Sequence, residues 1–179
     1  MNLLVDVDGV IVQYDFRCLF KKYFDHEELD NSLVYAYSIE DVLGVPRNTV
    51  TAMFAIEAPR IPKLWVDNST DSLKYLRAQG HVVYIWSKRA HFLGGTQPLI
   101  EWLNRSEIPF DYAASDPEEL PNVAFDYQID DSVPKLVENG LSVKHKLLFA
   151  NPWNVKCRNV LNLFRLVYSW KEIEEIINE

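Results

Sequence analysis

The chain has 179 residues, which suits one domain with at most a small inserted module. Its net charge of −8 argues against a nucleic-acid polymer or an anionic membrane surface as the main partner. No apolar run approaches the roughly 20 residues of a membrane-spanning helix, and the short N-terminal run contains Asp6 and Asp8, unlike a secretory signal. Two cysteines without metal-type spacing predict reduced thiols in a cytoplasmic protein.

Four short and nearly continuous apolar runs predict strands that are buried on both faces. They are NLLVDVD (2–8), HVVYIWS (81–87), FDYQIDD (125–131) and HKLLFA (145–150). Such runs are typical of parallel strands covered by helices on both sides.

The segments between these runs space their apolar residues as helices do. TDSLKYLRAQG (70–80) predicts a helix that stops at Gly80, and TQPLIEWLNRS (96–106) and DSVPKLVENG (131–140) repeat the pattern. The last segment, SWKEIEEIINE (169–179), predicts a helix with Ser169 as its N-cap. Alternating strands and helices predict an α/β fold with a parallel sheet and right-handed crossovers.

Residues 14–66 depart from this alternation of strands and helices. They form an aromatic-rich stretch with helical patterns that ends at the proline-bounded APRIP (58–62). We predict a small helical cap at 14–66, inserted after the first strand of a core domain formed by 1–13 and 67–179. Its aromatic rings could stack on a nucleobase or form a small core, and both interpretations stay open. These aromatic residues are Phe16, Tyr23, Tyr35, Tyr37, Phe54 and Trp65.

Polar side chains follow three of the predicted strands where each strand ends. They are Asp6 and Asp8, then Ser87, Lys88 and Arg89, and finally Asp130 and Asp131. Ligands bind beyond the carboxyl ends of parallel strands, so we expect these side chains to meet. Carboxylates suit Mg²⁺, which also accepts a substrate phosphate oxygen as a ligand. With a metal screening its charge, Asp6 could attack phosphorus as a nucleophile.

The ordered set Asp6-Val7-Asp8-Gly9-Val10, Ser87 and Asp130-Asp131 resembles motifs I, II and IV of the haloacid dehalogenase (HAD) superfamily. The resemblance covers nearly the whole chain. It implies a Rossmannoid three-layer α/β/α core with a parallel sheet and a small helical cap after the first strand. Within the superfamily, LFANPWN (148–154) and RLVYSW (165–170) are most similar to phrases of the 5′-nucleotidase C type, the 5′(3′)-deoxyribonucleotidases.

The resemblance implies a role for each matching residue. Asp6 would be the nucleophile, forming an aspartyl phosphate, and also a metal ligand. Asp8 would be the general acid and then the base, with its backbone carbonyl on Mg²⁺. Asp131 would bind the metal directly, with Asp130 acting nearby or through water. Phosphate contacts would come from Ser87, Lys88 and Arg89.

The implied activity is that of a Mg²⁺-dependent phosphomonoesterase acting on (deoxy)ribonucleoside monophosphates. Two alternatives stay open: a HAD phosphatase for another small phosphorylated metabolite or a polynucleotide end, and a HAD-fold protein with weak or lost turnover. The predicted partner is a small phosphorylated substrate, a nucleotide first, without a membrane or a nucleic-acid polymer. A homodimer is left open.

The sequence departs from the HAD pattern at one place. The family normally carries a lysine shortly before the acidic pair, but no lysine lies between Arg89 and Asp130. Its charge could come from Lys88 or Arg89, or from Arg60 or Lys63 in the cap. Without any substitute, turnover should be slow, because a fixed charge beside a transferring phosphoryl group is worth orders of magnitude in rate.

Each candidate residue also has a plainer interpretation. Asp6 and Asp8 could form a solvated turn, Ser87 could be a helix N-cap, and Asp130-Asp131 could complement the dipole of the next helix. Trp153 and Asn154 could serve in packing or at the edge of a substrate.

Overall fold

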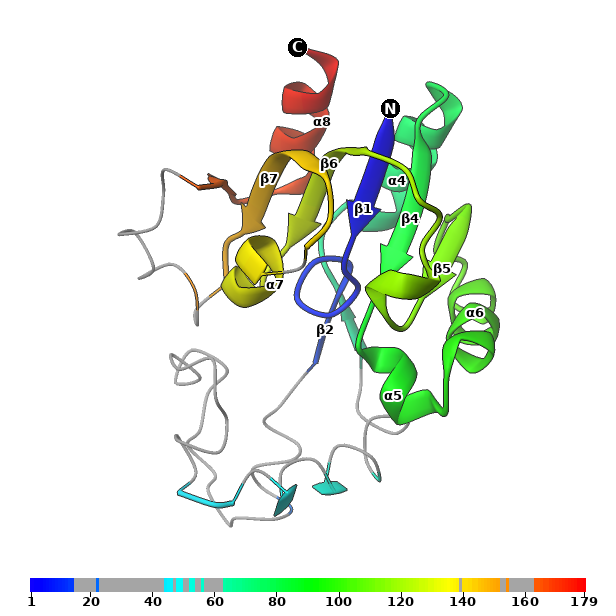
Figure 1. Cartoon of the computed structure of the whole chain (residues 1–179), viewed down its shortest axis with the longest axis vertical. Helices are drawn as coiled ribbons and strands as arrows, with labels where there is room; N and C mark the ends of the chain where they lie inside the picture. The colour runs from blue at the N-terminus through cyan, green and yellow to red at the C-terminus, as the bar shows by residue number, and fades with distance from the viewer. Residues whose placement is uncertain are drawn as a thin grey trace.

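The computed structural model describes residues 1–14, 63–138, 140–151, 154 and 163–179, together with 22, 44–46, 48–49, 52–53 and 56. A six-stranded parallel sheet organises the described part, in the order β5-β4-β1-β6-β7-β8 (Figure 1). The strands are β1 (Asn2–Val5), β4 (Val82–Trp86), β5 (Tyr112–Ala114), β6 (Phe125–Asp130), β7 (Val143–Phe149) and β8 (Arg165–Val167). The predicted α/β fold with a parallel sheet is confirmed.

The register of the central strands brings three chain segments to one edge of the sheet. Val5 of β1 is level with Ile85 of β4 and with Ile129 of β6. The residues that follow these positions therefore leave the sheet side by side, as expected for the carboxyl ends of parallel strands.

Helices cover both faces of the sheet. They are α4 (Ser69–Ala78), α5 (Arg89–Leu93), α6 (Thr96–Arg105), the 3₁₀ turn η2 (Pro117–Glu119), α7 (Val133–Glu138) and α8 (Trp170–Asn178). Buried apolar side chains of α4, α6 and α8 pack on one face, where Leu73, Leu103 and Ile173 belong to the same core cluster. On the other face, Leu136 of α7 packs with Leu148 of β7.

Two predicted helix ends are confirmed in detail. The side chain of Ser169 accepts a hydrogen bond from the Glu172 backbone N–H at 3.2 Å and caps α8. Gly80 follows the end of α4 with a positive φ of 85°, a conformation that glycine adopts without strain.

The insertion after the first strand is confirmed by a two-stranded antiparallel ribbon at its base. Val12 of β2 (Val12–Tyr14) pairs with Trp65 of β3 (Lys63–Trp65). Most of the chain between these strands lies outside the described residues, so the helical cap at 14–66 and the domain division stay predictions. In the described part, no helix is long and apolar enough to cross a membrane.

Candidate active site

The chain leaves β1 through a tight loop that contains Asp6, Asp8 and Gly9. The Val7 carbonyl accepts backbone hydrogen bonds from Ile11 at 2.9 Å and Val12 at 3.0 Å. Gly9 has a φ of 79°, in the left-handed region, and its N–H donates to the Val12 carbonyl at 2.8 Å.

Gly9 also lets the loop approach the end of β6. A Cβ atom at this position would lie 2.1 Å from Oδ2 of Asp131, much closer than any side-chain atom can tolerate. The absence of a side chain at Gly9 is therefore what brings the Asp131 carboxylate against the loop that follows Asp6.

Three carboxylates converge at this edge of the sheet. Asp6, Asp130 and Asp131 each offer an oxygen, and these oxygens lie within 4.8 Å of one another. All three side chains are buried, and Oδ1 of Asp6 has no hydrogen-bond partner among the described residues. A buried carboxylate oxygen without a partner, beside two more carboxylates, fits a hard cation such as Mg²⁺. This cluster contradicts the plainer interpretation of Asp6 as part of a solvated turn.

A buried lysine, which the sequence analysis did not single out, neutralises part of this charge. Lys135, in α7, places its Nζ 3.2 Å from Oδ2 of Asp6 and 3.0 Å from Oδ2 of Asp130. The same ammonium donates to the Trp86 carbonyl at 3.2 Å and lies 4.4 Å from the centroid of the Trp86 ring. Its position between two carboxylates is therefore fixed from several sides.

Burial and mutual repulsion change how these groups hold protons in the absence of a metal. Desolvation raises the pKa of Asp6 to about 7, opposed by the charge of Lys135 and reinforced by Asp130 and Asp8. Burial also raises the pKa of Asp130, again opposed by Lys135. The pKa of Lys135 is raised, because the two carboxylates outweigh the effect of its own burial. Lys135 is thus a permanent cation.

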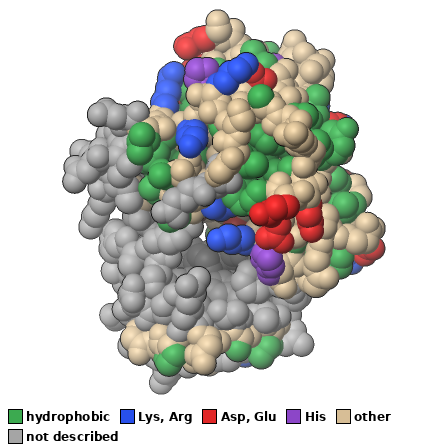
Figure 2. Space-filling model, viewed as in Figure 1, with side chains coloured by type: hydrophobic (Ala, Val, Ile, Leu, Met, Phe, Trp, Pro, Cys, Tyr) green, Lys and Arg blue, Asp and Glu red, His purple; other side chains and the backbone are tan. Residues whose placement is uncertain are grey.

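The residues that follow β4 leave the sheet at the same edge as the loop after β1. Ser87 is fully buried, and its hydroxyl accepts the Arg89 backbone N–H at 3.2 Å. The N-cap position of α5 is Lys88, so Ser87 lies one residue before the N-cap position that its plainer interpretation gave it. Lys88 is exposed, and its charge slightly lowers the pKa of Asp130. The Arg89 side chain is buried and is bonded to Asp8. In Figure 2, charged side chains of both signs gather beside a hollow in the surface.

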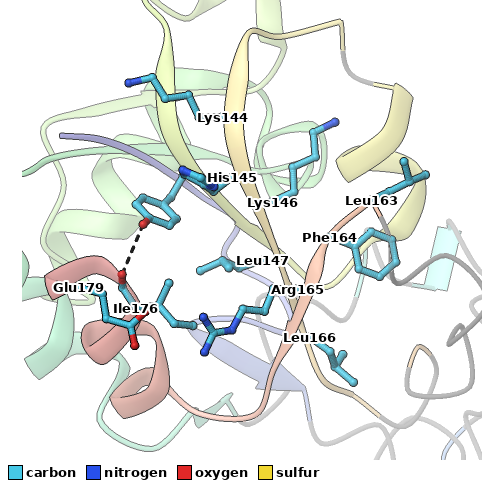
Figure 3. Close-up of a pocket in the computed structure, with 11 residues that line it drawn as sticks. Lys144, His145, Lys146, Leu147, Leu163, Phe164, Arg165, Leu166, Ile176 and Glu179 are labelled. Atoms are coloured by element: carbon cyan, nitrogen blue, oxygen red, sulfur yellow. Dashed lines mark hydrogen bonds between the residues drawn. The ribbon is translucent and has the colours of Figure 1, made fainter.

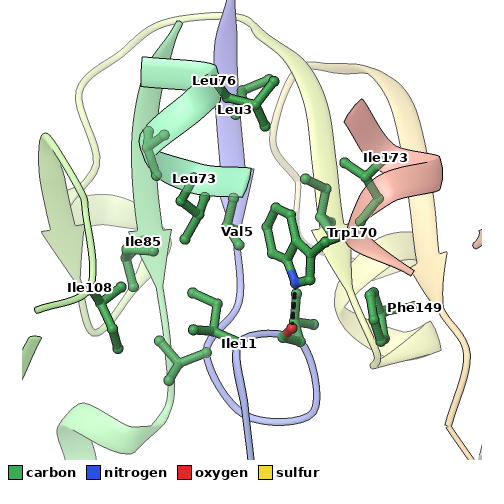
Figure 4. Packing of buried hydrophobic residues seen from close by; sticks show 14 of the residues in the cluster. Leu3, Val5, Ile11, Leu73, Leu76, Ile85, Ile108, Phe149, Trp170 and Ile173 are labelled. Atoms are coloured by element: carbon green, nitrogen blue, oxygen red, sulfur yellow. Dashed lines mark hydrogen bonds between the residues drawn. The ribbon is translucent and has the colours of Figure 1, made fainter. Parts of the chain in front are cut away.

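Three successive carbonyls of the loop after β1 are each held by a side chain from a different element. Asn151 Nδ2 donates to Gly9 at 2.8 Å, Trp170 Nε1 donates to Val10 at 2.8 Å, and Ser69 Oγ donates to Ile11 at 3.1 Å. Figure 4 shows the indole of Trp170 pointing from α8 into the core, with its N–H at the loop. The loop is therefore fixed by tertiary contacts.

The segment after β7 proves to be a support for the site. Asn154 is buried and donates to the Asp131 carbonyl at 2.9 Å and to the Phe149 carbonyl at 2.7 Å. Its Oδ1 accepts the Asn151 N–H at 2.8 Å. Of the two interpretations left open for Asn154, these bonds favour packing; Trp153 lies outside the described residues.

A separate pocket of about 780 Å³ lies at the sheet edge near the start of β7. Figure 3 shows Lys144, Lys146 and Arg165 on its walls. These residues lie near the beginnings of β7 and β8, whereas the carboxylate cluster lies at the strand ends, so this pocket is not the candidate active site.

Three solved structures resemble this chain over nearly their full length. A candidate haloacid dehalogenase-like hydrolase from Bacteroides fragilis gives a TM-score of 0.65 at 14% identity, covering 96% of this chain and 98% of that one. A predicted phosphatase from Clostridium acetobutylicum gives 0.59 at 17% identity, covering 98% and 97%. A HAD-superfamily hydrolase from Ehrlichia chaffeensis gives 0.57 at 11% identity, covering 98% and 95%. The chain has the HAD fold.

The HAD-like fold is shown by these solved structures alone. No model of a protein family and no curated protein sequence matches the chain. The predicted fold class is therefore confirmed, and membership in the 5′-nucleotidase group stays a prediction.

Lys135 supplies the positive charge beside Asp6 that was expected from another residue. The candidates for its charge were Lys88, Arg89, Arg60 and Lys63, yet the structure places Lys135 beside Asp6. Lys135 follows the acidic pair in sequence, in the helix that starts directly after β6. The first turn of such a helix lies above the carboxyl edge of the sheet, and this could have drawn attention to Lys135. Arg60 and the Lys63 side chain lie outside the described residues.

The predicted cap aromatics are largely untested. Trp65, in β3, is about half exposed. The others, Phe16, Tyr23, Tyr35, Tyr37 and Phe54, lie outside the described residues.

Proposed function

We propose that this protein is a Mg²⁺-dependent phosphomonoesterase that forms an aspartyl phosphate on Asp6, with nucleoside monophosphates as its first substrate class. The observation that carries the proposal is the buried cluster of Asp6, Asp130 and Asp131 with Lys135 between two of its carboxylates. The HAD fold supports it, as does the phosphatase description of one structure that resembles this chain.

The residues that would hold Mg²⁺ are Asp6 and Asp131, the Asp8 carbonyl, and Asp130 directly or through water. The unpartnered Oδ1 of Asp6 and the nearby oxygens of Asp130 and Asp131 match the ligands this ion prefers. When bound, the ion would offset the negative charge of the phosphoryl group and of the nucleophile.

In the proposed reaction Asp6 is the nucleophile and Asp8 is the general acid and base. An Asp6 oxygen forms a bond to phosphorus as the ester P–O bond breaks, and Asp8 gives its proton to the leaving oxygen. Water then attacks the phosphorus of the aspartyl phosphate, passing a proton to Asp8 and releasing inorganic phosphate with Asp6 restored. Lys135 stabilises the charge on Asp6, and Ser87 and Lys88 are proposed phosphate contacts.

Lys135 bears on the alternative in which turnover has been lost. That alternative arose because no lysine precedes the acidic pair, and a cation beside the nucleophile removes this reason. An active phosphatase for another small phosphorylated metabolite, or for a polynucleotide end, remains the second candidate, since substrate choice depends on the cap.

The test is phosphate release by purified protein with Mg²⁺. The panel contains deoxyribo- and ribonucleoside 5′- and 3′-monophosphates, sugar phosphates, a 3′-phosphorylated oligonucleotide and p-nitrophenyl phosphate. We expect nucleoside monophosphates to give the highest kcat/KM, and Asp6→Asn to abolish release. Asp71→Asn, at an exposed acid in α4, serves as the matched control. Release that survives Asp6→Asn would refute the proposal, and a preference for sugar phosphates would favour the second candidate.

A further inference from the structure

Arg89 forms an ion pair with the second aspartate of the loop. Its Nη2 donates to Oδ1 of Asp8, and the two groups differ sharply in exposure. The Arg89 side chain is 3% exposed, whereas that of Asp8 is 33% exposed. A buried cation thus holds one oxygen of a carboxylate whose side chain is partly exposed.

The Trp102 ring also contacts the guanidinium. The Arg89 Cζ atom lies 4.1 Å from the centroid of the Trp102 ring, and Trp102 is itself buried in α6. A cation over an aromatic face is attracted to it, and more strongly where water is excluded. The backbone of Arg89 is also held, since its N–H donates to Ser87 Oγ at 3.2 Å. Arg89 is therefore held both at its guanidinium and at its backbone.

From this geometry we propose that Arg89 is a positioning residue for Asp8, and not the direct phosphate contact predicted from its place after Ser87. The inference rests on the proposed function. An arginine side chain has donors only and stays charged, so it must remain a donor to Oδ1. The proton that Asp8 gives to the leaving oxygen is then carried on Oδ2, and the stacked guanidinium determines where that oxygen points.

If Arg89 positions Asp8, the effect of replacing Arg89 should depend on the leaving group of the ester. When the ester P–O bond breaks, an alkoxide leaving oxygen must receive the proton of Asp8. A nitrophenolate departs without that help, because its negative charge is delocalised. A displaced Asp8 should therefore slow alkyl phosphates far more than p-nitrophenyl phosphate, whereas loss of a phosphate contact should raise KM for both alike.

The experiment measures kcat and KM of Arg89→Met and Arg89→Lys on p-nitrophenyl phosphate and on the best alkyl substrate of the wild type. We expect Arg89→Met to lose at least about tenfold more kcat/KM on the alkyl ester than on p-nitrophenyl phosphate, because kcat/KM reports the step that cleaves the ester bond, whereas kcat also includes hydrolysis of the common intermediate. Arg89→Lys should recover part of that loss, because it keeps the charge but not the planar fork. Adding Arg89→Met to Asp8→Asn should cost nothing further, as for residues that act together. Arg77→Met, which breaks the Arg77–Asp111 pair near β4, is the matched control.

Different outcomes would refute the positioning role of Arg89 and the proposed phosphatase function. Equal losses on both esters, with higher KM and weaker inhibition by inorganic phosphate, would overturn the positioning role and make Arg89 a phosphate contact. If Arg89→Met does not fold, equal losses in Arg89→Lys would overturn the role in the same way. A wild type that hydrolyses no phosphate ester would instead refute the proposed function, and this role with it.

Discussion

Lys135 Nζ, from α7, lies 3.2 Å from Oδ2 of Asp6 in the loop that follows β1. Both side chains are buried, with 7% and 9% exposure. An ion pair at such depth is shielded from water and salt, so its charge acts strongly on a group that binds beside it.

Replacing Lys135 tests this pair. Lys135→Met keeps most of the volume and removes the charge, so we expect kcat to fall by about 100-fold or more, since a charge fixed near a transferring phosphoryl group is lost. Steady-state phosphate release with Mg²⁺ measures the change, after circular dichroism has shown that the variant is folded. Lys144→Met, at a lysine that is 64% exposed, is the control and should keep its activity. Equal activity of the two variants would show that Lys135 has only a structural role.

Gly9 should tolerate no side chain, for two separable reasons. Gly9→Ala introduces backbone strain at a φ of 79° and a Cβ 2.1 Å from the Asp131 carboxylate. Gly80→Ala isolates the first effect, because Gly80 has a φ of 85° but no atom of the described residues within 4 Å of the added Cβ. We expect Gly80→Ala to cost about 1–2 kcal/mol of unfolding free energy, and Gly9→Ala clearly more, with loss of phosphatase activity. Urea unfolding of both variants gives the comparison, and equal costs would mean that Asp131 moves aside freely.

Trp170 should stabilise the loop after β1 through its indole N–H. Trp170→Phe keeps an aromatic ring in the core but leaves the buried Val10 carbonyl without its 2.8 Å hydrogen bond. We expect a loss of about 1–3 kcal/mol in unfolding free energy, and faster amide hydrogen exchange at Ile11 and Val12. Trp65→Phe, at an exposed ring, should change neither measurement. Unaltered exchange in Trp170→Phe would contradict the clamping of this loop.

Asp126 should contribute stability that depends on pH. The pKa of its carboxyl is lowered below the ordinary 3.8, first by the hydrogen bond from Lys144 and then by the N–H of Asn2. A lowered pKa in the folded state means that this stability is present above the ordinary pKa and is lost as pH falls through the folded value. Asp126→Asn should therefore be less stable than the wild type near pH 7 by at most about 1 kcal/mol, because solvent screens an ion pair whose lysine is 64% exposed, and the difference should shrink near pH 2. Urea unfolding at both pH values tests this, and a constant difference would show that the ionised form is not what matters.

The sequence predicted the parts of this molecule that depend on local pattern. β1, β4, β6 and the second half of β7 are mostly buried, so their apolar runs are continuous and easy to recognise. The edge strands β5 and β8 have only three residues each, too few for a pattern, and were not predicted. The convergence of Asp6, Asp130 and Asp131 followed from the parallel topology alone.

Side-chain partnerships could not be predicted in the same way. Whether Lys135 turns toward Asp6, or Arg89 toward Asp8, depends on how α7 and α5 pack, and sequence spacing does not fix this. The same holds for Asn151, whose amide reaches the loop after β1 from a residue beyond β7. These tertiary contacts corrected the expected source of the missing charge and changed the interpretation of the segment after β7.

The most direct test of the account is to find where the phosphoryl group goes. Asp8→Asn removes the base that would activate water, so an intermediate on Asp6 should accumulate when this variant is mixed with Mg²⁺ and p-nitrophenyl phosphate. Acid quenching and peptide mass spectrometry should then find one phosphoryl group on the peptide that contains Asp6, and none when Mg²⁺ is replaced by a chelator. Phosphate release by the wild type, with no phosphorylated Asp6 or with the group on another residue, would contradict the account.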